Sequence, residues 1–345
     1  MRLVLFRSAR GLNLRADAAR ACASVRAAGF DGIEASLTDI GGSQTERRVF
    51  GKAAQAEGLE LILSAYSSWD SYEGEVSAHV STMLKELESL ADLNGSLSLQ
   101  LRLVNAHSGS DAWSEAQACE YFGAIAQASD AGLGGALPPV AHETHRGRYL
   151  CCPFTTARLL QRVPSLRLTS DLSHWVLKAE GLLDAPEEAR LLHCRITNPN
   201  PDPNADPDHD PDPDSDPDQA QLLRSCIAPA VDHIHARLGA PQLSDPRDPR
   251  HALAAARFYA FWAECWSARE AAAVSGRAAV ATATVEYGSP LEYGARGDYA
   301  GHTPVDHAGA PVAGCRLDTT LASASAELRH RFDVWHRDVS RRMDL

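Results

Sequence analysis

The second half of the chain places a carboxylate or an imidazole at or near the end of four successive aliphatic runs. These residues are Glu143, Asp171, His235 and Glu286. Three carboxylates that meet at one place repel one another and raise each other's pKa values unless a cation lies among them. Oxygen-rich ligation with a single imidazole suits Mn²⁺, Mg²⁺ or Co²⁺, and Zn²⁺ is also possible. The four residues therefore predict a site for one divalent metal ion.

Such a site suits proton transfer beside a carbonyl group. A cation chelated by adjacent carbonyl and hydroxyl oxygens acidifies the C–H bond between them and stabilises the enediolate that forms. One glutamate beside the cation can remove the proton, and a second acid on the opposite face can return it. Glu143 and Glu286 meet this requirement if their strands share one rim. We therefore expect a metal-dependent isomerase or epimerase for a small sugar, sugar phosphate or related hydroxy-carbonyl compound.

Other polar residues follow the same or neighbouring runs. Arg146 and Arg148 follow Glu143 closely and could pair with a phosphate or carboxylate of the substrate, or could be exposed loop charges. His107 ends an earlier run and is a further candidate for substrate binding. Glu34 lies on another run and either binds substrate or pairs with Arg7.

Eight short aliphatic runs must position these residues. They are 3–6, 31–37, 59–66, 99–107, 137–143, 166–171, 231–237 and 279–287. Helical patterns separate the runs, which indicates a parallel sheet with helical crossovers, and eight repeats favour a closed (β/α)₈ TIM barrel in one domain. Within strand 231–237, alternation places His233 and His235 on one face and Ile234 on the other. No GxGxxG motif follows the first run, which disfavours an open dinucleotide-binding sheet.

Two segments interrupt this pattern. Residues 198–219 form an Asp-Pro run with eight aspartates, which we expect to be a disordered acidic insertion because like charges repel and no apolar side chain can be buried. The run lacks the glycine turn and terminal glutamate of a calcium-binding EF-hand loop. Residues 289–316 are rich in glycine and proline and form a long loop after the eighth strand, either a lid over the site or an ordinary surface loop.

Composition excludes several other classes. The net charge of -12 opposes a nucleic-acid partner, although the Asp-Pro run carries most of it. No stretch has the roughly 18 apolar residues of a membrane span. The eight cysteines are scattered, and the adjacent pair Cys151 and Cys152 lacks CxxC spacing, so we expect reduced thiols in a cytoplasmic protein. A small-molecule substrate is the expected partner, and a homo-oligomer is compatible with the sequence.

The strings HETHRGR, DLSHW, HIHARLG followed by PQLSDPRDP, and VEYGSP resemble the xylose-isomerase-like TIM barrel superfamily, in its sugar phosphate isomerase/epimerase branch. The resemblance extends from LVLFRSARG to the C-terminus and is broken by the two insertions. It implies a barrel in which Glu143, Asp171, His235 and Glu286 bind the metal. It also implies that His174 and Arg237 contact substrate oxygens, and that Glu143 and Glu286 exchange the substrate proton from opposite faces.

The sequence departs from the epimerases of this branch at two places. Arg146 and Arg148 follow Glu143, and the loop after Glu286 is long, so a neutral ketohexose is in doubt as the substrate. The competing functions are a metal-dependent lyase resembling inosose dehydratase, or a hydrolase, on the same barrel. An endonuclease would need a basic track for DNA and further metal ligands. A binding protein without catalysis would be expected to lack one of the four ligands.

Overall fold

The computed structural model describes residues 1–68, 75–97, 99–130, 137–179, 223–238, 250–273, 279–286 and 317–343. Within them, eight parallel strands pair in chain order, and β8 pairs with β1 to close the ring. The strands are β1 (Arg2–Ser8), β2 (Gly32–Ser36), β3 (Glu60–Tyr66), β4 (Leu101–His107), β5 (Val140–Glu143), β6 (Leu168–Ser170), β7 (Val231–His235) and β8 (Val280–Val285). Each falls on one of the eight predicted runs, which confirms the (β/α)₈ TIM barrel.

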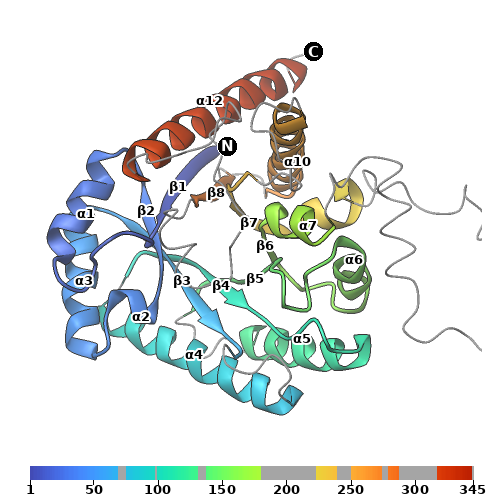
Figure 1. Ribbon diagram of the computed structural model, residues 1–345, viewed down its shortest axis with the longest axis horizontal. Coiled ribbons are helices and arrows are strands. Elements are labelled where there is room, and N and C mark those ends of the chain that lie inside the picture. Colours follow the sequence, from blue (N-terminus) through green and yellow to red (C-terminus); the bar gives the residue numbers. More distant parts are fainter. Residues whose placement is uncertain are drawn as a thin grey trace, which may run out of the picture.

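Helices surround the ring (Figure 1). They are α1 (Ala18–Ala27), α2 (Leu37–Ile40), α3 (Gln44–Ala56), α4 (Val76–Leu97), α5 (Glu115–Asp130), α6 (Pro153–Arg162), α7 (Leu172–Ala179), α10 (Arg250–Ala271) and α12 (Leu317–Met343). Two short turns, η2 (Leu223–Ile227) and η3 (Ala228–Ala230), precede β7. Ser36, the last residue of β2, is the N-cap of α2, and Ser43 is the N-cap of α3. Both serines form capping boxes, which fix the starts of the two helices soon after β2 ends.

The interior of the barrel has an apolar layer at the amino ends of the strands, which we call the floor. It consists of Val4, Phe6, Ile62, Leu103 and Ala141. The Phe6 ring occupies the space that a side chain at Gly32 would need, since a Cβ atom there would lie 2.4 Å from the ring and 2.3 Å from the Glu60 carbonyl oxygen. Glycine at position 32 therefore lets one large ring fill the floor.

A larger apolar core lies between the strands and the helices. On β7, Ile234 belongs to this outer core, whereas His233 and His235 face the barrel interior, as the strand alternation predicts. The N-terminal amino group lies 2.9 Å from His336 Nε2 on α12, which packs beside β1 (Figure 1).

The two predicted insertions, 198–219 and 289–316, lie outside the described residues, as do Cys194 and Cys315. The six described cysteines form no disulfide. None of the helices in the described ranges has the length and apolar character needed to cross a membrane.

Candidate active site

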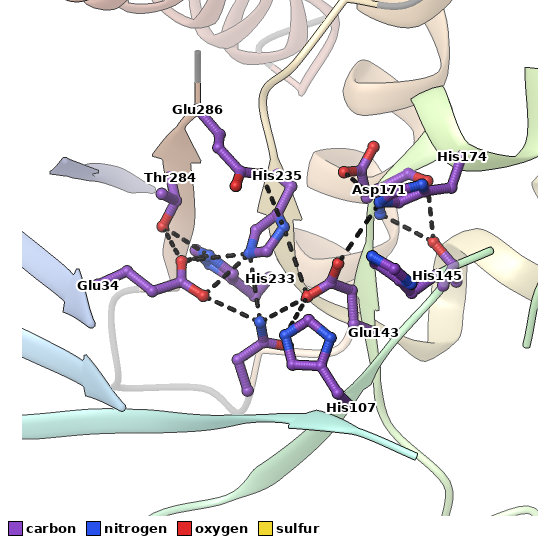
Figure 2. Close-up of polar contacts among 12 residues, drawn as sticks. Glu34, His107, Glu143, His145, Asp171, His174, His233, His235, Thr284 and Glu286 are labelled. Carbon is purple, nitrogen blue, oxygen red and sulfur yellow. Dashed lines mark hydrogen bonds and ion pairs between the residues drawn. The ribbon is translucent and has the colours of Figure 1, made fainter. Parts of the chain in front are cut away.

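The four predicted metal ligands converge above the floor, at the carboxyl ends of β5 to β8, in a layer that we call the rim (Figure 2). Glu143 ends β5, Asp171 follows β6, His235 ends β7 and Glu286 follows β8. His235 Nδ1 lies 3.7 Å from Glu143 Oε2 and 3.5 Å from Glu286 Oε2. Asp171, His235 and Glu286 each offer a ligand atom within 4.8 Å of the others. All four side chains are buried.

The state of His235 fits a role as a ligand. Its Nε2 lies 3.0 Å from Glu34 Oε1, so this nitrogen donates its proton to a carboxylate. Burial lowers the pKa of His235, but the surrounding glutamates outweigh burial and raise it well above the usual range, so without a cation Nδ1 also carries a proton. Nδ1 is buried and makes no hydrogen bond to any residue in the described ranges, and a metal ion bound there would replace its proton. Nδ1 is too far from the two flanking carboxylates for a hydrogen bond, but the separations suit ligands that share one cation. A histidine that donates its other N–H to a carboxylate is the usual arrangement in metal sites.

Glu34, on β2, orients the His235 ring through its contact with Nε2. Its carboxylate accepts hydrogen bonds from Asn105 Nδ2 at 2.9 Å and from the Thr284 hydroxyl. Burial raises the pKa of Glu34, but His235 and His233 outweigh burial and hold it well below its usual range. Glu34 is thus an anion that orients His235, while the Arg7 guanidinium donates to the backbone oxygens of Ser8 and Arg10.

Asn105 is a functional residue that the sequence prediction missed. It lies on β4, two residues before His107 and on the same face, and is fully buried. Its amide donates to Glu34 Oε1 and, at 2.8 Å, to Glu143 Oε2. Asn105 therefore links Glu34, which contacts His235, to the candidate ligand Glu143 on β5. Side chains two residues apart on a strand share a face, so the candidate residue His107 could have pointed to Asn105 in the same way that His235 points to His233.

Asp171 is fixed by the backbone around it. Its Oδ1 accepts hydrogen bonds from the backbone N–H and the hydroxyl of Ser173, at 3.0 and 2.5 Å. The Thr144 hydroxyl accepts from Asp171 N at 2.8 Å and donates to Asp171 O at 3.1 Å. Because Thr144 follows Glu143 directly, this exchange couples the positions of two candidate ligands.

Three of the predicted substrate-binding residues lie at the site. His107 stacks on Tyr66, and its Nε2 lies 3.0 Å from Glu143 Oε2. Arg237 Nη2 lies 3.0 Å from His174 Nε2 and 3.1 Å from Asp171 Oδ2. His107, His174 and Arg237 all line the pocket described below.

Arg146 and Arg148 are not among the residues that line the pocket. Arg148 is fully buried and donates to Gly109 O at 3.2 Å, in the loop that follows β4. The intervening Gly147 has φ +74°, so the chain turns between the two arginines. Arg148 is therefore not an exposed loop charge, and contact of either arginine with a substrate anion stays a prediction.

Two side chains at the site were not assigned a role from the sequence. His145 lines the pocket beside His174, and its Nδ1 donates to the Arg146 carbonyl oxygen at 2.5 Å. Arg10, from the loop after β1, places Nη2 3.2 Å from Glu286 Oε1. The contact joins residues from opposite ends of the sequence, because closure of the barrel makes β1 the neighbour of β8.

The two glutamates of the predicted proton-transfer pair have opposite electrostatic environments. Burial is the main cause that raises the pKa of Glu143 to about 7, and Glu286 and Asp171 add to it. Burial also raises the pKa of Glu286, but Arg10, Arg237 and His235 outweigh it and lower the value to about 2. Without a cation, the cluster thus favours a proton on Glu143 and a charge on Glu286.

These residues surround a pocket of about 620 Å³, a volume that includes its open mouth. The lining residues are Ser8, Ala9, Arg10, Glu34, Ala35, Ser36, Asp39, Ser64, Tyr66, Asn105, His107, Glu143, His145, His174, His235, Arg237, Thr284 and Glu286. Hydroxyl and charged groups dominate, which suits a hydrophilic ligand.

The fold is that of a closed barrel with its polar cluster at the carboxyl ends of the strands. Solved structures with this fold include D-allulose 3-epimerase from Methylomonas sp., 13% identical over 96% of this chain and 98% of that chain, with a TM-score of 0.56. L-ribulose 3-epimerase is 14% identical over 99% and 97%, with a TM-score of 0.56. A D-tagatose 3-epimerase-like protein is 11% identical over 97% and 99%, with a TM-score of 0.50.

No family model matches the chain, and no curated protein matches it by sequence. At such low identities, the likeness to the solved structures shows a shared fold. It confirms at that level the resemblance stated from the sequence motifs.

Proposed function

We propose that the protein is a metal-dependent isomerase or epimerase that acts on a small sugar, sugar phosphate or related hydroxy-carbonyl compound. One observation carries the proposal. Carboxylates from two strand ends, Glu143 and Glu286, flank a buried imidazole nitrogen, His235 Nδ1, that makes no hydrogen bond to a described residue. Asp171 offers a third carboxylate oxygen within 4.8 Å of His235 and Glu286. Arg10 and Arg237 compensate part of this buried charge, and a divalent cation would bind the carboxylates and the imidazole together.

Glu143, Asp171, His235 and Glu286 would hold one divalent ion. Bound there, the ion would polarise the carbonyl and hydroxyl oxygens of the substrate. Its identity is a proposal from ligand chemistry alone, with Mn²⁺, Mg²⁺ or Co²⁺ ahead of Zn²⁺ because most ligand atoms are oxygens.

The residues around the ion would transfer the proton and orient the substrate. Glu143 and Glu286 come from β5 and β8 and flank the imidazole at 3.7 and 3.5 Å, so they can face two sides of a substrate carbon. One would remove the proton next to the carbonyl, and the other would return it. His107, His174 and Arg237 would orient substrate oxygens, since all three line the pocket.

Turnover in D₂O tests this mechanism. A panel of ketoses, inososes and hydroxypyruvate is supplied to the metal-loaded protein, and product is analysed by NMR. Proton transfer places deuterium on the carbon beside the carbonyl, whereas a hydride shift between carbons places none. Glu143→Gln should abolish exchange at one face, and Glu120→Gln, an exposed residue on α5, should leave it unchanged. Product without deuterium under single-turnover conditions, together with normal turnover by Glu143→Gln, would contradict the proposal.

A metal-dependent lyase is the second candidate, and His145 favours it. Its Nδ1 proton is committed to the Arg146 carbonyl oxygen, and burial holds its pKa well below the usual range, so the imidazole that lines the pocket is neutral. A neutral imidazole could accept the proton next to the carbonyl, and Glu143, with its pKa raised to about 7, could then protonate a leaving hydroxyl group in a dehydration. Loss of water from an inosose, abolished by His145→Ala with the metal retained, would favour the lyase over the isomerase.

A further inference from the structure

Three side chains outside the pocket meet where the loops after β4 and β5 approach α7. Lys178 Nζ, on α7, lies 3.0 Å from Cys151 Sγ and 3.1 Å from Asp111 Oδ2. Cys151 follows β5, and Asp111 follows β4. None of the three takes part in the proposed reaction.

The cluster has a buried side and an open side. Cys151 is only 7% exposed, whereas the side chains of Lys178 and Asp111 are 44% and 37% exposed. A small oxidant can therefore reach the junction of sulfur and nitrogen from solvent. Asp111 holds the Lys178 nitrogen beside the sulfur. Burial lowers the pKa of Lys178, but Cys151 and Asp111 outweigh it and raise the pKa, so the ammonium group must lose a proton to solvent before its nitrogen can be oxidised.

We propose that Cys151 and Lys178 are an oxidative modification site, at which peroxide converts the thiol and the amine into a covalent N–O–S bridge. The contact already places the two reacting atoms side by side, and one inserted oxygen atom would join them.

The reaction uses two molecules of hydrogen peroxide. The first oxidises the thiol to a sulfenic acid and is reduced to water. The second oxidises the pair formed by the S–O–H group and the amine. The O–H bond and one amine N–H bond break, an O–N bond forms, and two molecules of water leave. Sulfur is oxidised in the first step and nitrogen in the second, and the peroxide is the sole oxidant.

The pKa of the thiol sets the rate. Burial raises the pKa of Cys151, and Lys178 lowers it in turn without cancelling the effect of burial. Since the thiolate is the reactive form, we expect slow modification over hours rather than the fast response of an exposed, acidic cysteine.

The bridge would join two neighbours of the rim. The loop from β5 to Cys151 begins at Glu143, and the first turn of α7 follows Asp171. A link between positions 151 and 178 would close a 27-residue segment. Such a closure limits the unfolded chain, so oxidised protein should melt at a higher temperature than reduced protein.

Peptide mass spectrometry of the full chain tests the proposal. The protein is treated with hydrogen peroxide, digested without reductant, and compared with an untreated sample. The expected product is a cross-linked pair of peptides from around residues 151 and 178. Its mass exceeds the sum of the two reduced peptides by one oxygen atom less two hydrogen atoms. Dithiothreitol should release both peptides.

Two variants and one neighbouring residue serve as controls. Lys178→Arg keeps a positive charge beside Asp111 but should yield no cross-link. Cys151→Ser should yield none either. Cys152 is 6% exposed, as buried as Cys151, and reports on peroxide access to the same loop. A disulfide between Cys151 and Cys152, or sulfinic acid at Cys151 with Lys178 unmodified, would overturn the proposal. So would an unmodified Cys151 after Cys152 has been oxidised.

Discussion

The floor and the rim belong to the same barrel but differ in the polarity of their side chains. The floor is apolar, is filled by Phe6 against Gly32, and contains no charge that needs a partner. A few residues further along the strands, the rim gathers Glu143, Asp171 and Glu286 around one imidazole. Apolar burial stabilises the floor, whereas the rim holds several carboxylates close together with partial compensation from Arg10 and Arg237. The floor can therefore be perturbed through its packing and the rim through its charges.

The largest effect should come from the floor. Phe6→Ala removes a fully buried ring that contacts both Gly32 and His233, and should lower the free energy of unfolding by about 3–5 kcal/mol. Urea unfolding of the metal-free protein measures this, with Phe6→Leu as the milder control. Equal stability of Phe6→Ala and the wild type would refute the description of the floor as a packed core.

The rim should respond in metal affinity rather than in folding. Purified protein should bind close to one divalent ion per chain, and Asp171→Asn should weaken binding by about 100-fold or more. Calorimetric titration with Mn²⁺ and with Co²⁺ measures the affinity, and Asp92→Asn, exposed on α4, is the matched control. Stoichiometric metal in an Asp171→Asn/His235→Ala double variant would rule out the assigned site.

Asp232 is a further test case, because it is a half-buried carboxylate on β7 that pairs with two arginines and lies outside the set of candidate ligands. It lies 2.7 Å from Arg167 Nη2 and 2.6 Å from Arg269 Nη1. Burial raises the pKa of Asp232, but the two arginines outweigh burial and lower it. Its contribution to stability is therefore present above the unfolded-state pKa of about 3.9 and is lost as the pH falls through the lower folded-state value.

Asp232→Asn should cost about 1–2 kcal/mol at pH 7, discounted because both arginines are about one third exposed. The difference from the wild type should shrink below about pH 4. Urea unfolding at several pH values, with and without metal, checks both points. A cost that depends on metal would show that Asp232 is coupled to the rim.

The smallest effect should come from a segment that belongs to neither layer. Deletion of residues 199–218 should change the melting temperature and any activity very little, because the segment has like charges and nothing apolar to bury. Thermal unfolding of the shortened chain is the measurement. A large loss of stability would show that the acidic run supports the barrel.

The sequence predicted the strands well because each buried strand is a short aliphatic run between helical patterns, and because side chains alternate across it. That alternation placed His235 inside the barrel and Ile234 outside correctly. The four candidate ligands were predicted from the ends of four successive runs and from the motif resemblance, and the structure brings all four together.

What the sequence could not provide is the closure of the ring and the path of the loops. Nothing in the chain order says that Arg10 meets Glu286, because that contact exists only once β1 pairs with β8. Arg148 was a candidate for substrate contact because it is close to Glu143 in sequence. The chain turns at Gly147, which has a positive φ, and Arg148 does not line the pocket. The role of Glu34 was left open because a strand glutamate does not reveal which histidine faces it.

The candidate cation ligands all come from β5 to β8, while Ser8, Arg10, Ser36 and Tyr66 on the opposite wall come from β1 to β3 and the loops that follow them. The protein can therefore be regarded as two cassettes. The β5–β8 cassette would carry the proposed reaction, and the β1–β3 cassette carries much of the surface that a substrate would meet. Exchange of the β1–β3 cassette is a route to new specificity with the chemistry retained. Its condition is that the new β2 supplies a carboxylate that accepts from His235 and from Asn105 of β4, as Glu34 does.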